Sequence, residues 1–300
     1  MDKKRIAVLL SALFAMTSLV SAQTQAPKPP AAMVYVPVGV TGPKGAVLDL
    51  KKDNFVLLED GIEQTLTAFY EPNSRIDIDI ILAMRALNKG RTDLNSIKIR
   101  EAIENFRQQG NSQNKYTLEE MPFGANGIFD AISRHVTRLA DQSIATRKGL
   151  IVITDGFESS GGEPVKALQE YVKKFDVPIY IFFAVDPTGG GGGPSDDILE
   201  VARGERVYLS QGAGYEDLTR MTGGSMTQAE IDTQLRAMME TFAKTLKSQY
   251  VLGFRSTNDA RDDKWRKIEI KIKAPQPVDG IAAKDMKTKS RDRYFVAKVK

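Results

Sequence analysis

Hydrophobic and polar positions in the middle of the chain follow two alternating periods. Continuous apolar runs predict buried strands at 76–82, 150–153 and 178–185. Between them, apolar residues recur at helical spacing and predict helices near 94–106, 126–139 and 165–175. Continuous apolar strands separated by amphipathic helices are typical of a parallel sheet that helices cover on both faces. The predicted fold class is therefore α/β, with a doubly wound, mostly parallel sheet.

A further helix is predicted near 229–248, because apolar side chains form one stripe along it. The stripe contains Ile231, Leu235, Met238, Met239, Phe242 and Leu246. Amphipathic helices in α/β domains normally bury such a face, so we interpret the stripe as core that packs against the sheet. A groove for a partner is the alternative interpretation.

The two ends of the mature chain have strand patterns of a different kind. Short β-type runs occupy 33–70, with Glu59-Asp60-Gly61 as a hairpin signal, and recur at 250–254 and 293–296. From Trp265 to Lys273, isoleucines alternate with charged residues, which predicts a strand with one solvated face. We expect the N- and C-terminal segments to build one small β-sandwich into which the α/β domain is inserted. The alternative is that the two segments form two unrelated β appendages. No sequence feature decides between one shared β-sandwich and two separate appendages.

The first residues have the pattern of a secretory signal. Lys3, Lys4 and Arg5 precede an apolar run at 6–16, and the small-residue exit Val20-Ser21-Ala22 predicts cleavage after Ala22. An uncleaved membrane anchor is disfavoured, because the apolar run at 6–16 is much shorter than the roughly 20 apolar residues that a membrane-spanning helix needs. We therefore expect a periplasmic or secreted protein with no stable membrane span. The expected organisation is a signal peptide (1–22), a Pro-rich tether (23–32), an N-terminal β segment (33–72), an α/β domain (75–247) and a C-terminal β segment (248–300).

Composition excludes several function classes. The chain of 300 residues has no cysteine and one histidine, which excludes disulfides, thiolate nucleophiles, iron–sulfur clusters and zinc centres built from Cys and His. The formal net charge is +4, and the expected cleavage removes three basic residues and one acidic residue, which leaves +2. Bulk charge therefore gives no support for nucleic-acid binding.

Sequence motifs for catalysis are also absent. His135 follows Ser133-Arg134 inside a predicted helix, and the chain contains no G-x-S-x-G elbow, phosphate loop or strand-linked G-x-G-x-x-G. We therefore interpret His135 as a solvated histidine on a helix face. The run Gly189–Gly193 predicts a flexible loop, and the acidic pairs Asp196-Asp197 and Asp262-Asp263 predict polar turns. These observations predict a protein without enzymatic activity and without a cofactor.

Several motifs together resemble one known family. They are, in chain order, Leu50-Lys51-Lys52-Asp53-Asn54-Phe55, Leu58-Glu59-Asp60-Gly61, Ile153-Thr154-Asp155-Gly156, Thr222-Gly223-Gly224, Ser248-Gln249-Tyr250-Val251-Leu252-Gly253-Phe254, Trp265-Arg266-Lys267-Ile268 and Arg291 to Phe295. Over nearly the whole mature sequence, the chain resembles the von Willebrand factor A (VWFA)-related domain proteins typical of acidobacteria. The resemblance implies an exported protein with a von Willebrand A-type doubly wound domain.

The resemblance also implies a binding site that has lost its metal. In such domains a metal-ion-dependent adhesion site holds magnesium through an Asp-x-Ser-x-Ser motif after the first strand, a loop threonine and an aspartate after the fourth strand. Here the positions of the first motif hold Ala83, Arg85 and Leu87, the threonine position holds Asn126, and only Asp155 matches. The site is therefore expected to be degenerate and to bind no metal.

The candidates for partner binding are Arg85, Asn126 and Asp155. One alternative is that Arg85 replaces the metal and forms an ion pair with Asp155. The other is that Arg85 points into solvent and Asp155 only caps its turn. The interval 83–126 is short for two strands and a helix, so we expect the hairpin usually found there to be truncated.

The main functional hypothesis is an exported, non-catalytic module that binds an unidentified protein partner. Binding is expected at loops that follow the carboxyl ends of the parallel strands, at 83–90, 124–127 and 156–162. A second hypothesis is a divalent-metal-dependent adhesion receptor that uses other ligands, such as Asp77, Asp79 or Asn88. A third is a hydrolase with an unrecognised acidic site, because a fold alone does not determine a function.

Overall fold

The computed structural model describes most of the chain. The described residues are 33–84, 94–121, 127–141, 147–154, 162–185, 214–231 and 233–298. The predicted signal peptide and tether, residues 1–32, lie outside them, as does the run Gly189–Gly193. Within the described part of the chain, no helix has the length and apolar character needed to cross a membrane.

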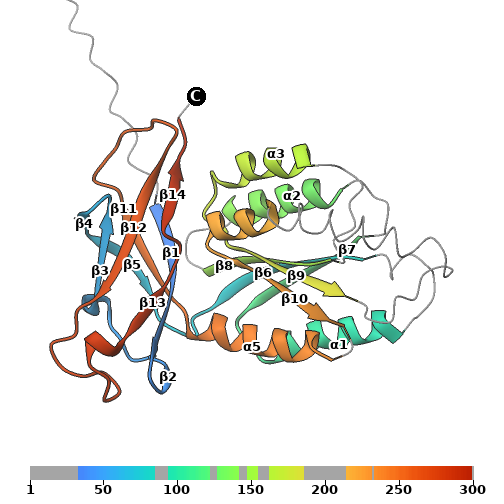
Figure 1. The fold of residues 1–300 in the computed structure, drawn as a ribbon, viewed down its shortest axis with the longest axis horizontal. Coiled ribbons are helices and arrows are strands. Elements are labelled where there is room, and N and C mark those ends of the chain that lie inside the picture. Colours follow the sequence, from blue (N-terminus) through green and yellow to red (C-terminus); the bar gives the residue numbers. More distant parts are fainter. Residues whose placement is uncertain are drawn as a thin grey trace, which may run out of the picture. The chain divides into compact units, whose positions relative to one another are not determined.

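The middle of the chain folds as an α/β unit around a five-stranded parallel sheet (Figure 1). The strand order is β10-β9-β8-β6-β7, so the chain passes from β6 to one side and then continues on the other. This confirms the predicted α/β class with a parallel sheet. The strands are β6 (Ile76–Ala83), β7 (Lys115–Met121), β8 (Arg147–Thr154), β9 (Ile179–Val185) and β10 (Ser225–Glu230). The helices are α1 (Leu94–Gln108), α2 (Ile128–Asp141), α3 (Gly162–Val172) and α5 (Leu235–Ser248), and residues 214–222 are also helical.

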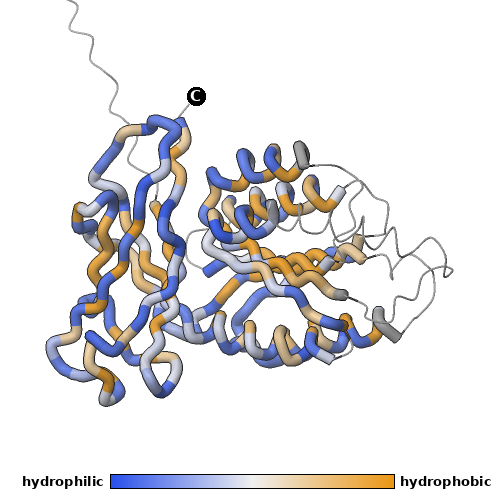
Figure 2. The backbone as a smooth tube through the Cα atoms, in the orientation of Figure 1, coloured by the Kyte–Doolittle hydropathy of each residue, from blue (hydrophilic) through white to orange (hydrophobic). Residues whose placement is uncertain are grey.

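Helices cover both faces of this sheet, with α2 and α3 on one side and α1 and α5 on the other (Figure 1). Alternate residues of β6 enter two separate cores. Ile78, Ile80 and Leu82 pack with α1 and α5, and Ile81 packs with α2 and α3. The strands therefore carry apolar residues on both faces, which Figure 2 shows as an orange layer between the helices.

The two ends of the described chain form antiparallel sheets. One sheet has the order β13-β1-β11-β5, with β2 added to β1, and the other has the order β14-β12-β3-β4. Side chains of both sheets share one core, including Val36 and Leu252 from the first and Leu57 and Ile270 from the second. The elements are β1 (Met33–Gly42), β2 (Gly45–Ala46), η1 (Lys52–Asn54), β3 (Phe55–Glu59), β4 (Ile62–Gln64), β5 (Leu66–Tyr70), β11 (Tyr250–Arg255), β12 (Lys264–Ile272), η3 (Ala283–Asp285), β13 (Lys287–Lys289) and β14 (Arg293–Val296).

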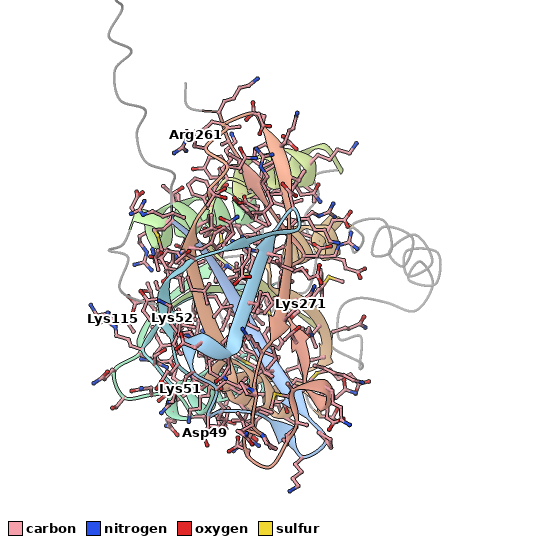
Figure 3. The ribbon with its side chains drawn as sticks, turned by 90° about the vertical axis from the view of Figure 1, so that its left-hand side faces the viewer. Asp49, Lys51, Lys52, Lys115, Arg261 and Lys271 are labelled. Atoms are coloured by element: carbon pink, nitrogen blue, oxygen red, sulfur yellow. The ribbon has the colours of Figure 1, made fainter. Side chains whose placement is uncertain are left out.

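Local sequence signals in these sheets have clear structural counterparts. Asp60 (φ 48°) and Gly61 (φ 85°) make a two-residue turn between β3 and β4, in which both residues need positive φ. On β12, Ile268 and Ile270 are buried, whereas Lys267, Glu269 and Lys271 are exposed. Lys271 lies on the solvated surface in Figure 3. The predicted hairpin and the predicted strand with one wet face are thus confirmed.

Strands from opposite ends of the sequence are neighbours. In the first sheet, β11 pairs with β1 and also with β5, so that Val34 faces Phe254 and Tyr70 faces Val251. In the second sheet, β12 pairs with β3. The chain leaves β5, builds the α/β unit and returns directly beside β5 as β11. The α/β unit is therefore an excursion between two adjacent antiparallel strands.

Two buried arginines lie where the α/β unit meets the antiparallel sheets. Arg147 opens β8 and donates through Nη1 to the carbonyl of Ser74 (3.3 Å) and through Nη2 to the carbonyl of Leu246. Arg291 donates to Asp176 Oδ1 (2.7 Å) and to the carbonyl of Tyr35 (2.8 Å). Arg147 thus joins the segment that enters the α/β unit to the helix that leaves it, and Arg291 joins β1 to the turn after α3.

Two features differ from the sequence expectations: the start of the last long helix and the two edge strands of the parallel sheet. The helix expected at 229–248 begins at Leu235, because residues 225–230 form β10 beside β9. The apolar stripe on α5 is buried, which confirms the interpretation as core. The polar edge strands β7 and β10 were not predicted. Between α1 and α2, the described residues contain one strand, β7, and it runs parallel to β6.

A tight contact between β9 and the turn before β10 generates a testable prediction. A Cβ atom at Gly224 would lie 1.8 Å from the carbonyl oxygen of Ile179, which is backbone and cannot move aside. Because overpacking typically costs 1–3 kcal/mol, we expect Gly224→Ala to lose at least about 3 kcal/mol. At roughly 2 to 4 °C per kcal/mol, the melting temperature should fall by about 6 °C or more.

The matched control is Gly39→Ala on β1. A Cβ atom there would lie 3.9 Å from the nearest atom, the carbonyl oxygen of Lys289, at an ordinary contact distance. We expect its melting temperature to stay within about 2 °C of the wild type, as for a neutral surface change. Equal melting temperatures for Gly224→Ala and Gly39→Ala would contradict the described approach of these two backbones.

Candidate functional site

The carboxyl edge of the parallel sheet is where ligands bind in open α/β folds. They occupy the crevice at the point where the strand order reverses. Here that point lies between β6 and β8, since β7 flanks β6 on one side and β8 on the other. The last residues of these strands, Ala83 and Thr154, are neighbours in register, and Ala83 also faces Met121 at the end of β7.

Most of the predicted site residues lie outside the described part of the chain. Arg85, Leu87, Asn88, Asn126 and Asp155 belong to this group. Ala83 is described: it ends β6 and is partly buried. A methyl group therefore stands at the carboxyl end of β6, between Thr154 and Met121.

The alternative metal ligands Asp77 and Asp79 are buried in the first half of β6. Arg75 donates to both carboxylate oxygens of Asp77, at 3.1 and 3.2 Å. Asp79 contacts His135 and Arg138. Within the residues that the structure describes, no group of three or more His, Cys, Asp or Glu side chains is arranged to hold a metal ion.

Asp79 belongs to a buried ionic network that the sequence analysis missed. His135 Nδ1 lies 2.6 Å from Asp79 Oδ2, and His135 Nε2 lies 2.8 Å from Glu119 Oε2. Arg138 contacts Asp79 Oδ1 and Thr117, and Arg134 contacts Glu119 at 2.8 Å. Asp79 and His135 are 1% and 5% exposed, whereas the arginine side chains reach solvent. The network thus connects β6, β7 and α2.

The expectation that His135 is solvated was wrong. His135 lies on the buried face of α2, together with Ile128, Ala131, Ile132, Val136 and Leu139. A signal was present in the sequence, because His135 shares the 3–4 residue spacing of this apolar stripe. Asp77 and Asp79 likewise interrupt an apolar strand. Buried polar groups need hydrogen-bond partners. A histidine in the apolar stripe of a helix and an aspartate in an apolar strand therefore indicate that the two side chains are hydrogen-bonded to each other.

The geometry favours a doubly protonated imidazole. Each ring nitrogen faces a carboxylate oxygen, so both nitrogens must carry a proton to donate both hydrogen bonds. The hydrogen bond to Asp79 raises the pKa of His135, burial opposes this, and the bond to Glu119 raises it further. Arg134 and then His135 lower the pKa of Glu119.

This arrangement binds a proton but does not present a reactive group. The two carboxylates sit on opposite sides of the imidazole ring, so they cannot converge on one metal ion. Both ring nitrogens are occupied, which leaves neither of them to act as a base toward a substrate. The network instead connects the edge strand β7 and helix α2 to β6, the strand next to the edge.

Comparisons with known proteins place no further constraint on the site. No protein-family model matches this chain, and no curated protein sequence is significantly similar to it.

The ionic network predicts a measurable proton affinity. Because His135 is the single histidine in the chain, its imidazole C–H signals report one site in an untagged protein. We expect an NMR titration midpoint above 6.5, the ordinary value for histidine. A midpoint at or below 6.5 would contradict the paired geometry. The conservative change Asp79→Asn should lower the midpoint, since it removes the main cause of the shift.

The same proton links stability to pH. A pKa raised in the folded state stabilises the protein fully below the unfolded value of about 6.5, and this stabilisation is lost as the pH rises through the folded value. One proton changes the free energy of unfolding by at most about 1.4 kcal/mol per pH unit. We expect the stability of wild type to fall more between pH 6 and pH 9 than that of His135→Gln, which has no titrating ring.

Proposed function

We propose that this protein is an exported, non-catalytic interaction module with a von Willebrand A-like domain, and that it binds a protein partner without a metal ion. The observation that carries the proposal is Ala83 at the carboxyl end of β6. The resemblance to VWFA-related proteins assigns a metal-binding aspartate to this position, and a methyl group cannot ligate magnesium.

The parallel sheet and its strand order support the location of the site. The reversal point between β6 and β8 is where a ligand is expected in this class of sheet. In the sequence, Arg85 follows Ala83 by two residues and Asp155 follows Thr154 directly. We propose these two charges as the residues that contact the partner, together with Asn126.

Among the described residues between α1 and α2, β7 is the one strand, and this agrees with a shortened form of the family's sheet edge. The von Willebrand resemblance implies a hairpin in this interval, and the chain between α1 and α2 is short for one. The shortened edge of the sheet and Ala83 in place of the first metal-binding aspartate both favour a site that no longer binds a metal ion. The periplasmic or secreted location remains part of the proposal, and it depends on the predicted signal at 1–22.

The test is capture of envelope proteins on immobilised mature protein, with and without EDTA. We expect the same captured partner under both conditions, and at least a roughly tenfold loss with Arg85→Glu, since a desolvated charge contact is worth more than 1.4 kcal/mol. The matched control is Lys115→Glu, which makes the same charge change at the exposed first residue of β7, on the opposite edge of the sheet.

The outcomes separate the competing functions. Capture that requires magnesium and fails in Asp155→Ala would support a metal-dependent receptor instead. Equal loss in Arg85→Glu and Lys115→Glu would contradict a site at the carboxyl edge. Turnover of a glycan or peptide substrate by the mature protein would contradict the non-catalytic assignment.

A further inference from the structure

The antiparallel sheets contain two turns with the same sequence and the same backbone conformation. One is Asp60-Gly61-Ile62 between β3 and β4, and the other is Asp279-Gly280-Ile281 between β12 and η3. Asp60 and Gly61 have φ of 48° and 85°, and Asp279 and Gly280 have φ of 54° and 72°. Both are two-residue turns of the primed kind that Asp-Gly favours. The two turns therefore offer the same chemistry in different surroundings.

An aspartate that precedes glycine can convert to isoaspartate without an enzyme. The glycine nitrogen attacks the aspartate Cγ, the carboxyl OH and the N–H proton leave together as water, and a cyclic succinimide forms. Water then adds at the carbonyl that belonged to the main chain, and the opened ring leaves the main chain running through Cβ and Cγ. Glycine has no side chain to hinder the attack. The reaction therefore depends on whether the carboxyl group is free to turn toward that nitrogen and carries a proton.

The carboxylate of Asp60 is fixed by its neighbours. Its Oδ1 accepts a hydrogen bond from the Lys267 amide (2.8 Å), and its Oδ2 lies 3.8 Å from Nε of the buried Arg266. Both contacts favour the ionised carboxylate. Asp60 must therefore break a hydrogen bond to a charged group, and gain a proton, before its Cγ can react with the Gly61 nitrogen.

The carboxyl group of Asp279 has no such anchor. Among the described residues, no backbone amide and no basic side chain is bound to it, and the residue is exposed. Its contact is a hydrogen bond with the carboxyl group of Asp49, which Figure 3 labels. A hydrogen bond between two carboxyl groups needs a proton. This bond, together with the negative charge of Asp279, raises the pKa of Asp49. A proton is thus held beside the oxygen that must leave as water.

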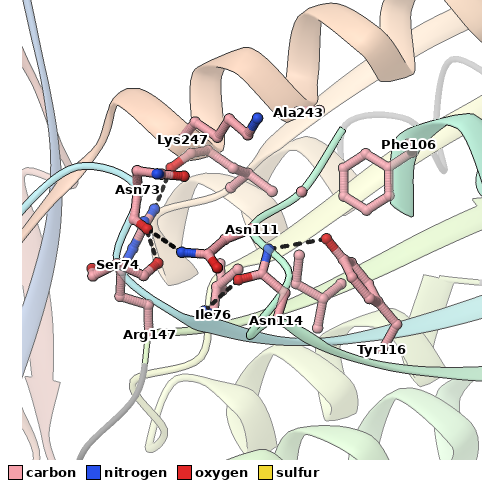
Figure 4. A pocket seen from close by; sticks show the side chains of 13 residues that line it. Asn73, Ser74, Ile76, Phe106, Asn111, Asn114, Tyr116, Arg147, Ala243 and Lys247 are labelled. Carbon is pink, nitrogen blue, oxygen red and sulfur yellow. Dashed lines mark hydrogen bonds between the residues drawn. The ribbon is translucent and has the colours of Figure 1, made fainter. Parts of the chain in front are cut away.

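Asn73 also has positive φ (61°), but its surroundings oppose the corresponding reaction. The nucleophile would be the amide of Ser74, which donates to the carbonyl of Glu71 (3.2 Å). The Asn73 amide donates to the carbonyl of Lys247 (2.7 Å), and its carbonyl accepts from Asn111 Nδ2 (2.6 Å), as Figure 4 shows. The backbone at Asn73 is therefore held on both sides.

Asp263 (φ 56°) is anchored in the same way as Asp60. Its Oδ1 accepts from the Lys298 amide (2.8 Å), and the residue after it is Lys264, whose side chain hinders the attack. Among the described aspartates with positive φ, Asp279 thus combines an unanchored carboxyl group with a following glycine.

We propose that Asp279 converts spontaneously to isoaspartate in the folded protein, and that the contacts of Asp60 protect the matching turn. The Asp49 carboxyl group supplies the proton to the leaving oxygen. Water, released in the first step and consumed in the second, is the one co-reactant. Conversion lengthens the main chain next to Ile281, which is 7% exposed and belongs to the core of the antiparallel sheets. This inference does not depend on the proposed partner site.

The first test is peptide mapping of the mature protein after incubation at mildly acidic pH. Trypsin separates the two sites, since Asp60 falls in peptide 53–75 and Asp279 in peptide 274–284. Isoaspartate gives a peptide of unchanged mass that elutes separately and is methylated by protein isoaspartyl methyltransferase. We expect conversion at Asp279 to be at least roughly tenfold faster than at Asp60, where a hydrogen bond to a charged group must break. Equal rates, or faster conversion at Asp60, would overturn the proposal.

The matched control is the same incubation in guanidinium chloride. Both sites have the sequence Asp-Gly-Ile, so we expect their rates to become similar once the chain is unfolded. A difference of the same size in the folded and the unfolded protein would overturn the proposal, because the folded contacts would then have no part in it.

The variant Asp49→Asn tests the proton donor. Its amide donates to the Asp279 carboxylate and favours the ionised form, so conversion at Asp279 should slow while the rate at Asp60 stays unchanged. Asp53→Asn makes the same change at an exposed residue of η1 and should alter neither rate. Equal conversion at Asp279 in the wild type and in both variants would contradict the role of Asp49.

Discussion

The structure depends on the antiparallel pairing of β11 with β5 and β1. This pairing requires residues 76–246 to begin and end at the same place, because Tyr70 and Val251 are direct neighbours. Any α/β unit that meets this constraint must bring its first strand and its last helix together. Asn73 and Lys247 are joined by a backbone hydrogen bond of 2.7 Å, and Arg147 bridges the same two segments. The closed excursion places the amino edge of the parallel sheet, with Ser74 and Arg147, at this joint.

Buried charges recur where elements from distant parts of the sequence meet. Arg147 lies between the entering and leaving segments, Arg291 between β1 and the turn after α3, and His135 between β6 and β7. Buried ion pairs add little net stability compared with apolar packing, but they tolerate few alternative arrangements. We therefore interpret these groups as contacts that specify how the elements dock, while the three apolar cores supply most of the stabilisation.

The interior of the fold was easier to predict than its edges. β6, β8 and β9 are buried on both faces, so their continuous apolar runs identify them. The edge strands β7 and β10 carry mostly exposed or partly exposed polar residues and have no such signal. The predicted start of α5 was too early because residues 225–230 form the edge strand β10, which the pattern did not indicate. A hydrophobic pattern in the sequence arises only where side chains are buried. Too few side chains of an edge strand are buried to produce such a pattern.

The candidate site was predictable only in part. Ala83 has the place that the sequence analysis gave it, at the end of the first parallel strand. The ionic network was missed because each of its members was considered alone: a histidine on a helix and an aspartate in a strand. Arg147 gave no signal at all, since its role depends on two carbonyl groups that lie about 70 and 100 residues away in the sequence.

The central claim is that the pairing of β5 with β11, together with the Arg147 bridge, makes the α/β unit and the antiparallel sheets one cooperative structure. The chain has one tryptophan, Trp265 on β12, and one histidine, His135 on α2, so each part has its own probe. The decisive measurement is urea unfolding followed by Trp265 fluorescence and by the His135 imidazole signals. The account predicts coincident transitions in the wild type, as expected for two-state unfolding. Two separate midpoints in the wild type would contradict it.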